Sequence, residues 1–213
     1  MITRFGINKI LAGLARFVSS ILTPLLMPTY GAIIVLWASV LCTNPTGHRV
    51  AVIMVMLGIT CVLPMIGIGV LHHFGVISDK RLGKSSERHI PYAIALACYT
   101  AATFYLNHVH SPMWFTMFAA GGTVALLITA LVNIKWKISA HLTGIGGVVA
   151  LVYQLHSMNL GVFTMKWLLC AVILLAGVLG TARLILKCHT VMQAILGFVS
   201  GFTCVTLAMK LFG

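Results

Sequence analysis

The polar residues between positions 181 and 193 have the types and the spacing of a site that handles phosphate. Arg183 precedes His189 by six residues, and Gln193 follows His189 by four, so His189 and Gln193 share one face of a helix. A guanidinium group can clamp anionic oxygens, an imidazole can act as a nucleophile or an acid/base group, and an amide can hold that imidazole. Gly197 and Gly201 continue this face and predict close packing against another helix.

Two further polar stretches, at positions 72–91 and 135–141, supply groups of the same kinds. Their cations and a hydroxyl can bind phosphate oxygens, and a second histidine can transfer a proton. The residues concerned are Lys80, Arg81, Arg88, Ser139 and His141. Together with Arg183 and His189 they predict a metal-free phosphoryl-transfer site, in which positioning and charge stabilisation do most of the work.

The composition indicates that a membrane helix bundle must position these residues. The chain has 213 residues, of which 60% are hydrophobic and 8% are charged, and its mean hydropathy is +1.07. A water-soluble domain needs far more polar surface, so we expect an all-α polytopic membrane protein. No linker, second domain or internal repeat is visible, which predicts a single transmembrane bundle over residues 21–213.

The charge balance narrows the classes of partner. Fourteen Lys and Arg residues stand against two acids, Asp79 and Glu87, which gives a net charge of +12. The chain has no soluble basic domain with interleaved aromatic residues, so we expect it to bind anionic lipid headgroups or phosphate and no nucleic acid. Two acids are too few for a Mg²⁺-diphosphate site, and the six cysteines show no zinc spacing. We therefore expect no metal and no cofactor.

Seven apolar runs have roughly the ~20 residues that a bilayer requires. They lie at residues 21–41, 51–74, 91–107, 112–133, 141–157, 165–182 and 189–210. The alternative is six spans, with the first run tilted or re-entrant. Residues 1–20 alternate apolar and basic positions at helical spacing, which indicates either an interfacial amphipathic helix or a basic flank that orients the first span.

Seven spans place the N-terminus and all three polar stretches on the same face of the membrane. That face carries 11 of the 14 cations, and the opposite face carries Arg49, Lys166 and Lys210. By the positive-inside rule, the site-bearing face is cytoplasmic. We therefore expect an integral protein of the bacterial inner membrane. The sequence indicates no oligomeric state.

In order and spacing, the three polar stretches resemble the motifs of the membrane type 2 phosphatidic acid phosphatases (the PAP2 superfamily). That family carries Lys-x6-Arg-Pro, then Pro-Ser-Gly-His, then Ser-Arg-x5-His-x3-Asp. The matching segments here are Arg81-x6-Arg88 with Lys80 beside it, Ser139-Ala140-His141, and Arg183-x5-His189-x3-Gln193. The resemblance covers about residues 72–205 and implies a PAP2-like helical core.

The resemblance also implies a role for each matching residue. His189 attacks phosphorus and becomes a transient phosphohistidine, His141 protonates the leaving alkoxide, and Gln193 orients His189. The residues that hold the phosphate are Lys80, Arg81, Arg88, Ser139 and Arg183. The chain departs from the family at Gln193, where the family has Asp, at Ala182, where it has Ser, and around Ser139, which lacks the family's Pro and Gly neighbours.

These features predict a metal-independent phosphatase that removes a phosphate monoester from a membrane lipid. A cytoplasmic site favours phosphatidylglycerophosphate or phosphatidate as the substrate, and an outward-facing site favours a prenyl phosphate or a lipid A phosphate. One alternative is a catalytically inactive relative that binds or moves phosphorylated lipids. Another is a haem protein with histidine ligands, although no feature of the sequence pairs its histidines.

Overall fold

The structure, a computed structural model, describes residues 2–74 and 89–213, with side chains from residue 9 onward. Within these ranges the regular elements are helices, and the strand-like pairing is a single antiparallel bridge between Ser39 and Gly161. The predicted all-α class is therefore confirmed for the described part of the chain.

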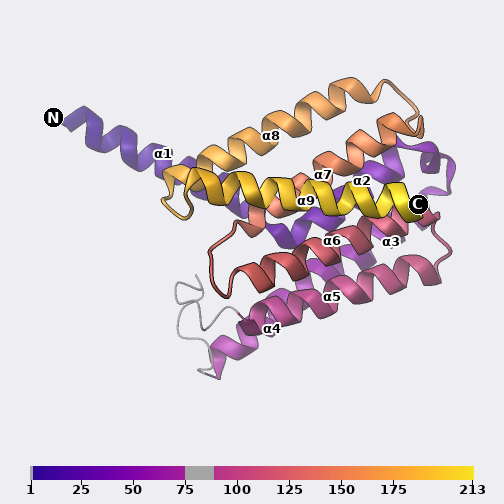
Figure 1. Cartoon of the computed structure of the whole chain (residues 1–213), viewed down its shortest axis with the longest axis horizontal. Helices are drawn as coiled ribbons and strands as arrows, with labels where there is room; N and C mark the ends of the chain where they lie inside the picture. Colours follow the sequence, from indigo (N-terminus) through magenta and orange to yellow (C-terminus); the bar gives the residue numbers. More distant parts are fainter. Residues whose placement is uncertain (1, 75–88) are drawn as a thin grey trace.

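The helices run back and forth along one long direction (Figure 1). The N-terminal half contains two helical segments, each interrupted by a tighter or wider turn. In chain order its elements are α1 (Ile2–Ile21), η1 (Pro24–Leu26), α2 (Met27–Ala38), η2 (Val40–Thr43), α3 (Thr46–Leu57), η3 (Gly58–Val62) and α4 (Leu63–His73). The remaining elements are α5 (His89–His108), α6 (Met113–Val132), α7 (Ala140–Ser157), α8 (Met165–Ile185) and α9 (Val191–Phe212).

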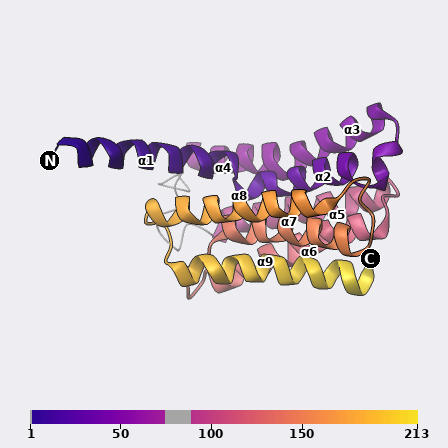
Figure 2. The ribbon, with the colours of Figure 1, turned by 90° about the horizontal axis from the view of Figure 1, so that it is seen from above.

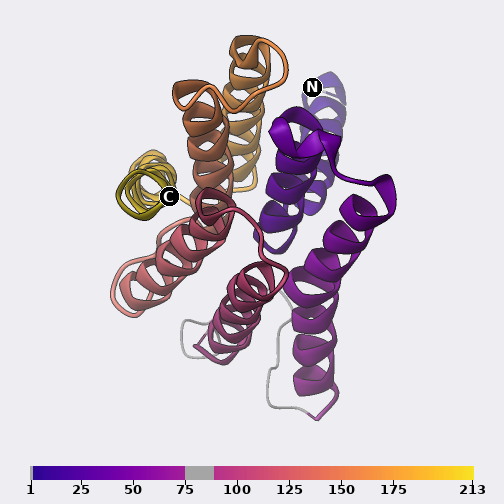
Figure 3. The same cartoon turned by 90° about the vertical axis from the view of Figure 1, so that its right-hand side faces the viewer.

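Five helical segments within the described residues are long and apolar enough to cross a membrane. They are Lys9–Ala38, Thr46–His73, Met113–Val132, Met165–Ile185 and Val191–Phe212. The helices α5 and α7 run beside these segments but are less apolar. Helix α7 packs on α2, α6, α8 and α9, so little of its surface is left to face lipid. Its sequence can therefore be less apolar than that of a lipid-facing helix. Seen along the bundle, α7 lies between α9 and α2 (Figure 3).

The structure joins the expected segment at residues 1–20 and the start of the expected span at 21–41 into one helical run. Helix α1 continues through η1 into α2, and the residues from Lys9 to Ala38 together are long and apolar enough to cross a membrane. Figure 2 shows α1 extending along the direction of the bundle and beyond its end. Helix α1 packs on α8, and the small side chains of Ala15 and Ser19 on α1 are buried. Small residues let two helices approach closely, which explains why this segment joins the bundle.

The second helical segment widens into a π-helical turn, η3, immediately before Pro64. Proline has no backbone N–H to donate to the preceding turn, so a locally altered hydrogen-bond pattern is expected at this point. Thr60 and Cys61 of this turn are buried, and the Thr60 hydroxyl donates to the Met56 carbonyl at 2.8 Å. Thr60 also lies 3.4 Å, oxygen to oxygen, from the Thr29 hydroxyl of α2. These contacts fix η3 against α2.

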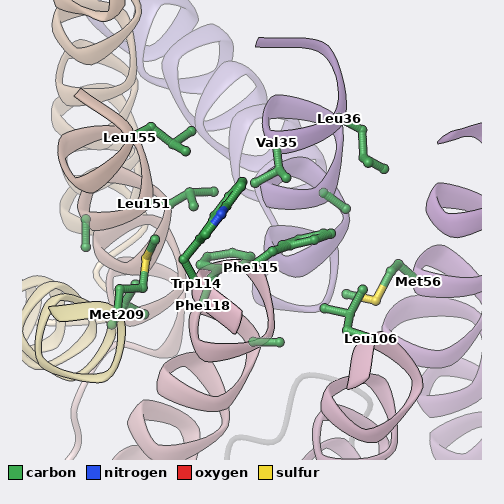
Figure 4. Close-up of a cluster of buried hydrophobic side chains, with 14 of the residues drawn as sticks. Val35, Leu36, Met56, Leu106, Trp114, Phe115, Phe118, Leu151, Leu155 and Met209 are labelled. Atoms are coloured by element: carbon green, nitrogen blue, oxygen red, sulfur yellow. The ribbon is translucent and has the colours of Figure 1, made fainter. Parts of the chain in front are cut away.

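The main hydrophobic core lies between α2, α3, α5, α6, α7 and α9 (Figure 4). Its largest fully buried side chains are Leu36, Met56, Leu106, Phe115, Leu151, Leu155 and Met209. The first turn of α6 and the last turns of α7 and α9 contribute to it, so it holds together the end of the bundle at which those turns lie. The α6–α7 and α8–α9 links, which carry Ser139 and His189, are at the opposite end (Figure 1).

Helices α7 and α9 pack with their backbones in contact. A Cβ atom added to Gly197 would lie 2.7 Å from the Ser139 carbonyl oxygen, and a Cβ atom on Gly201 would overlap the Thr143 carbonyl oxygen. Gly146, on the facing side of α7, is equally close to the Phe198 carbonyl. The predicted close packing at Gly197 and Gly201 is thus confirmed, and it sets the position of both helix N-termini.

Candidate functional site

A cavity of about 410 Å³ lies at the end of the bundle where the α6–α7 and α8–α9 links meet. Its polar wall combines a lysine, an arginine, a thiol and two imidazoles, and the rest of its lining is mainly apolar. The polar wall consists of Lys137, His141, Arg183, Cys188 and His189. The structure therefore brings together three of the predicted site residues, His141, Arg183 and His189.

The α8–α9 link holds His189 between two helix caps. At the end of α8, Lys187 adopts a left-handed backbone with φ of 52°, its N–H donates to the Leu184 carbonyl, and the Cys188 N–H donates to the Arg183 carbonyl. This pair of hydrogen bonds is the Schellman motif that ends many helices. Thr190 then caps α9. Because both neighbours of the Cys188–His189 pair are fixed, the position of His189 at the cavity is fixed as well.

The α6–α7 link is held by Asn133. Its amide nitrogen donates to the Thr129 carbonyl at 2.8 Å and to the Tyr92 hydroxyl at 3.2 Å, and its amide oxygen accepts from the Ile138 N–H at 3.2 Å. The Ser139 N–H donates to the Gln193 carbonyl at 3.3 Å, which joins this link to the start of α9. One asparagine and one backbone hydrogen bond thus bring the two site-bearing links together.

His141 lies at the start of α7, outside the five candidate spans. Its Nε2 atom is 3.3 Å from the Ser19 carbonyl oxygen of α1. Because a carbonyl oxygen only accepts, Nε2 carries a proton in this arrangement and Nδ1 has the free lone pair. Burial, followed by the nearby Arg183 cation, holds the pKa of His141 below its usual range, and the Ser19 carbonyl opposes this shift. The imidazole is therefore neutral near pH 7 in this structure.

The described wall of the cavity is positively charged. Arg183 is partly buried, and its Nε atom has no hydrogen-bond partner among the described residues. Both acids of the chain, Asp79 and Glu87, fall outside those residues, so no acidic side chain of the described ranges offsets Arg183. Helices α7 and α9 both begin at this end, and helix N-termini favour anions. The cavity is thus suited to bind an anion.

Two predicted site residues do not line the cavity. Ser139 is fully buried, and its hydroxyl accepts from the Leu142 N–H as the N-cap of α7. The Gln193 side-chain oxygen accepts from the Thr190 N–H at 3.0 Å, and Thr190 accepts from the Gln193 N–H in return. This reciprocal pair is a capping box. In the structure both residues therefore cap helices, in contrast to the expected roles of phosphate binding for Ser139 and orientation of His189 for Gln193.

The other predicted phosphate-binding residues, Lys80, Arg81 and Arg88, lie outside the described residues. Of their stretch, 72–91, the structure describes residues 72–74 and 89–91, and Pro91 lines the cavity. The start of α5 is thus part of the same site.

Replacing Gln193 with alanine is expected to affect stability more than activity, because the side chain caps α9. Loss of the cap should destabilise the protein by about 0.5–2 kcal/mol. Thermal unfolding in detergent, measured beside phosphate release, tests this prediction. A loss of phosphate release without a lower unfolding temperature would instead return Gln193 to the role of orienting His189.

Several polar residues of the cavity are not among the site residues predicted from the sequence, and they include Tyr92, Tyr99, Asn133 and Lys137. An asparagine at the end of an apolar run, two residues before a lysine pair, is the signal that could have indicated a structured link. No group of three or more His, Cys, Asp or Glu residues within the described ranges is arranged to hold a metal ion.

Fold and cavity together define an all-α integral membrane protein with a basic, imidazole-containing cavity at one end of its helix bundle. No protein-family model, no curated protein and no solved structure matches the chain. The function therefore has to be argued from the cavity itself and from the spacing of its residues.

Proposed function

We propose that this protein is a metal-independent phosphatase of a membrane lipid phosphate, with His189 as the nucleophile. The observation that carries this proposal is the cavity wall in which His141, Arg183 and His189 meet. These residues come from two polar stretches with the spacing of the second and third motifs of the PAP2 superfamily. A PAP2-like core of six to seven spans is part of the proposal.

The proposed reaction has two displacement steps. In the first, a ring nitrogen of His189 attacks phosphorus, the bond between phosphorus and the lipid oxygen breaks, and the lipid alkoxide takes up a proton to leave as an alcohol. In the second, water attacks the phosphohistidine and gives a proton to His141, the N–P bond breaks, and inorganic phosphate leaves. Splitting one difficult displacement into two easier ones is the general advantage of a covalent intermediate.

His141 is the proposed proton carrier. A phosphate bound beside it supplies the negative charge that favours the protonated imidazole, which counteracts the effect of burial and of Arg183 on its pKa. The proton then passes to the leaving alkoxide. Arg183 and Lys137, with the N-termini of α7 and α9, are proposed to hold the phosphate oxygens, and the resemblance adds Lys80, Arg81 and Arg88 to this set.

A lipid is the proposed substrate because the cavity has one polar and one apolar wall. The apolar wall comes from η1, α4, α5 and α6, and it includes Leu25, Ile68, Ala95 and Leu126. An amphiphile with a phosphate headgroup matches both walls. Phosphatidylglycerophosphate, phosphatidate, prenyl phosphates and lipid A phosphates all have this character.

The proposed orientation places the site in the cytoplasm. Among the described residues, the cavity end of the bundle carries Lys135, Lys137, Arg183 and Lys187, and the opposite end carries Arg49, Lys166 and Lys210. The excess of cations at the cavity end follows the positive-inside rule, and the sequence adds Lys80, Arg81, Lys84 and Arg88 between α4 and α5.

The second candidate function is binding or transport of phosphorylated lipids without turnover. The observation that favours it is that Ser139 and Gln193, at two positions of the family motifs, cap helices in this structure. A protein of this kind would keep the basic cavity and lose the chemistry.

Phosphate release by the detergent-purified protein separates the two candidates. The substrate panel contains phosphatidylglycerophosphate, phosphatidate, a prenyl phosphate and lipid A, with EDTA in every reaction. Release that persists in EDTA supports the phosphatase. Binding of these lipids by a folded protein that releases no phosphate from any of them would support the second candidate.

Replacing Arg183 with alanine is expected to lower kcat/KM for the lipid phosphate by about 10- to 100-fold, because a charged hydrogen bond to phosphate is lost. Steady-state kinetics measure the change. The matched control is Lys135→Ala, which removes an exposed cation at the same end that does not line the cavity. Equal losses in the two variants would mean that Arg183 contributes general surface charge and no specific phosphate contact.

A further inference from the structure

The basic cavity continues into the bundle as a row of smaller cavities. The second, of about 40 Å³, shares Pro24, Tyr99, Leu126 and Ala140 with the lining of the first. The third, of about 20 Å³, shares four lining residues with the second, and these are Pro28, Tyr99, Phe118 and Gly122. Shared walls place the three cavities in a row that leads from His141 and His189 towards η3 and α6.

Tyr99 forms part of the wall of all three cavities. Its hydroxyl donates to the Pro24 carbonyl at 2.6 Å, and Pro24 lines both the first cavity and the second. This hydrogen bond thus joins η1 to α5 in the wall that the two cavities share.

The inner cavities are apolar. Within the second, the hydroxyls of Thr129 and Thr143 lie 3.2 Å apart, and Thr143 also donates to the Ser139 carbonyl, so these groups are already satisfied. No Lys, Arg or His lines the second or third cavity. Apolar cavities of this kind stay dry and bind apolar guests.

We propose that this row of cavities binds the end of a hydrocarbon tail of the lipid phosphate, while the phosphate lies against His141, Arg183 and His189. The inference rests on the proposed function for the identity of the headgroup. The tail then runs into the bundle between η1 and α5, and the depth of the row sets the preferred chain length. The substrate class that fits is a phosphate monoester with at least one long, unbranched or prenyl chain.

Gly122 provides the test, because it lines both inner cavities and a Cβ atom added to it meets no other atom within 4 Å. The side chain of the variant Gly122→Leu therefore starts in open space and places its methyl groups in the row of cavities. The matched control is Gly69→Leu on α4, where an added Cβ atom also meets nothing and the residue is exposed. Thermal unfolding of both variants shows that each is folded.

Dodecyl phosphate and para-nitrophenyl phosphate are the two substrates for these variants. Gly122→Leu is expected to lower kcat/KM for dodecyl phosphate by about 10-fold or more, the scale of effect for methylene groups in a hydrophobic pocket. It should leave kcat/KM for para-nitrophenyl phosphate, which has no tail, unchanged. Gly69→Leu should change neither value. An unchanged value for dodecyl phosphate in a folded Gly122→Leu variant would overturn the tail site.

Photolabelling gives a readout that does not depend on turnover. Dodecyl phosphate with a diazirine at the end of its tail is irradiated with the wild-type protein, and the labelled residues are found by mass spectrometry. Labels at Tyr99, Phe118 or Ala125 support the tail site even if no phosphate is released, and in that case the phosphatase proposal alone fails. Labels confined to lipid-facing residues such as Ile173 and Leu174 would overturn the tail site, even in an active enzyme.

Discussion

Replacing His189 with alanine is expected to abolish phosphate release from the lipid substrate, with a loss of about 10³-fold or more. The imidazole is the proposed nucleophile, so its removal eliminates the covalent step, and the remaining cations of the cavity can only bind the phosphate. Single-turnover release of phosphate in EDTA measures the loss, and binding of the lipid phosphate to the variant should persist.

The matched control for this variant is His156→Ala. His156 lies in the last turn of α7, at the opposite end of the bundle from the cavity. Its removal should leave phosphate release within a factor of about two, since substitutions away from special sites change little. Full activity in a folded His189→Ala variant would eliminate His189 as the nucleophile, while equal losses in both variants would point to a general effect on the fold.

Replacing Gly201 with leucine is expected to disrupt the fold. The Cβ atom alone would overlap the Thr143 carbonyl oxygen of α7, and backbone atoms cannot move aside as a flexible side chain can. Overpacking costs about 1–3 kcal/mol at ordinary core positions, and a clash with backbone should exceed that range. The measurement is the unfolding temperature in detergent, together with monodispersity on size-exclusion chromatography.

The control variant for Gly201 is Gly177→Leu. Gly177 lies in α8, and a Cβ atom added there meets nothing within 4 Å. Its variant should unfold at the wild-type temperature. A stable Gly201→Leu protein would show that α7 and α9 separate without loss of the fold, and the site would then not depend on their close packing.

The positions of most helices were predictable because an apolar run has to fold into a helix inside a membrane. The runs at 112–133, 165–182 and 189–210 correspond to α6, α8 and α9 within a few residues. The location of the helix at residues 1–20 was not predictable in the same way. Whether a basic, amphipathic helix lies in the membrane surface or joins a bundle depends on a partner, and here the partner surface of α1 is provided by α8.

Residue spacing predicted which polar stretches meet at the cavity, but not which atoms face it. His141, Arg183 and His189 line it, and Lys137, in the predicted stretch 135–141, joins them. Ser139 and Gln193 match motif positions and yet cap helices, because a hydroxyl or amide at a helix start also satisfies backbone N–H groups. The spacing Thr190-x2-Gln193 is itself a capping-box pattern, so the sequence could also have predicted that Gln193 caps a helix.

The central claim, that His189 carries the phosphate during turnover, is tested most directly by trapping the intermediate. The purified protein is mixed with lipid phosphate in EDTA, quenched with base, in which phosphohistidine is stable, and analysed by mass spectrometry for the site of phosphorylation. We predict a phosphate on His189 that forms and decays at the rate of phosphate release and is absent from the His189→Ala variant. Phosphate release at full rate with no phosphate on His189, or with phosphate on another residue, would contradict the proposed mechanism.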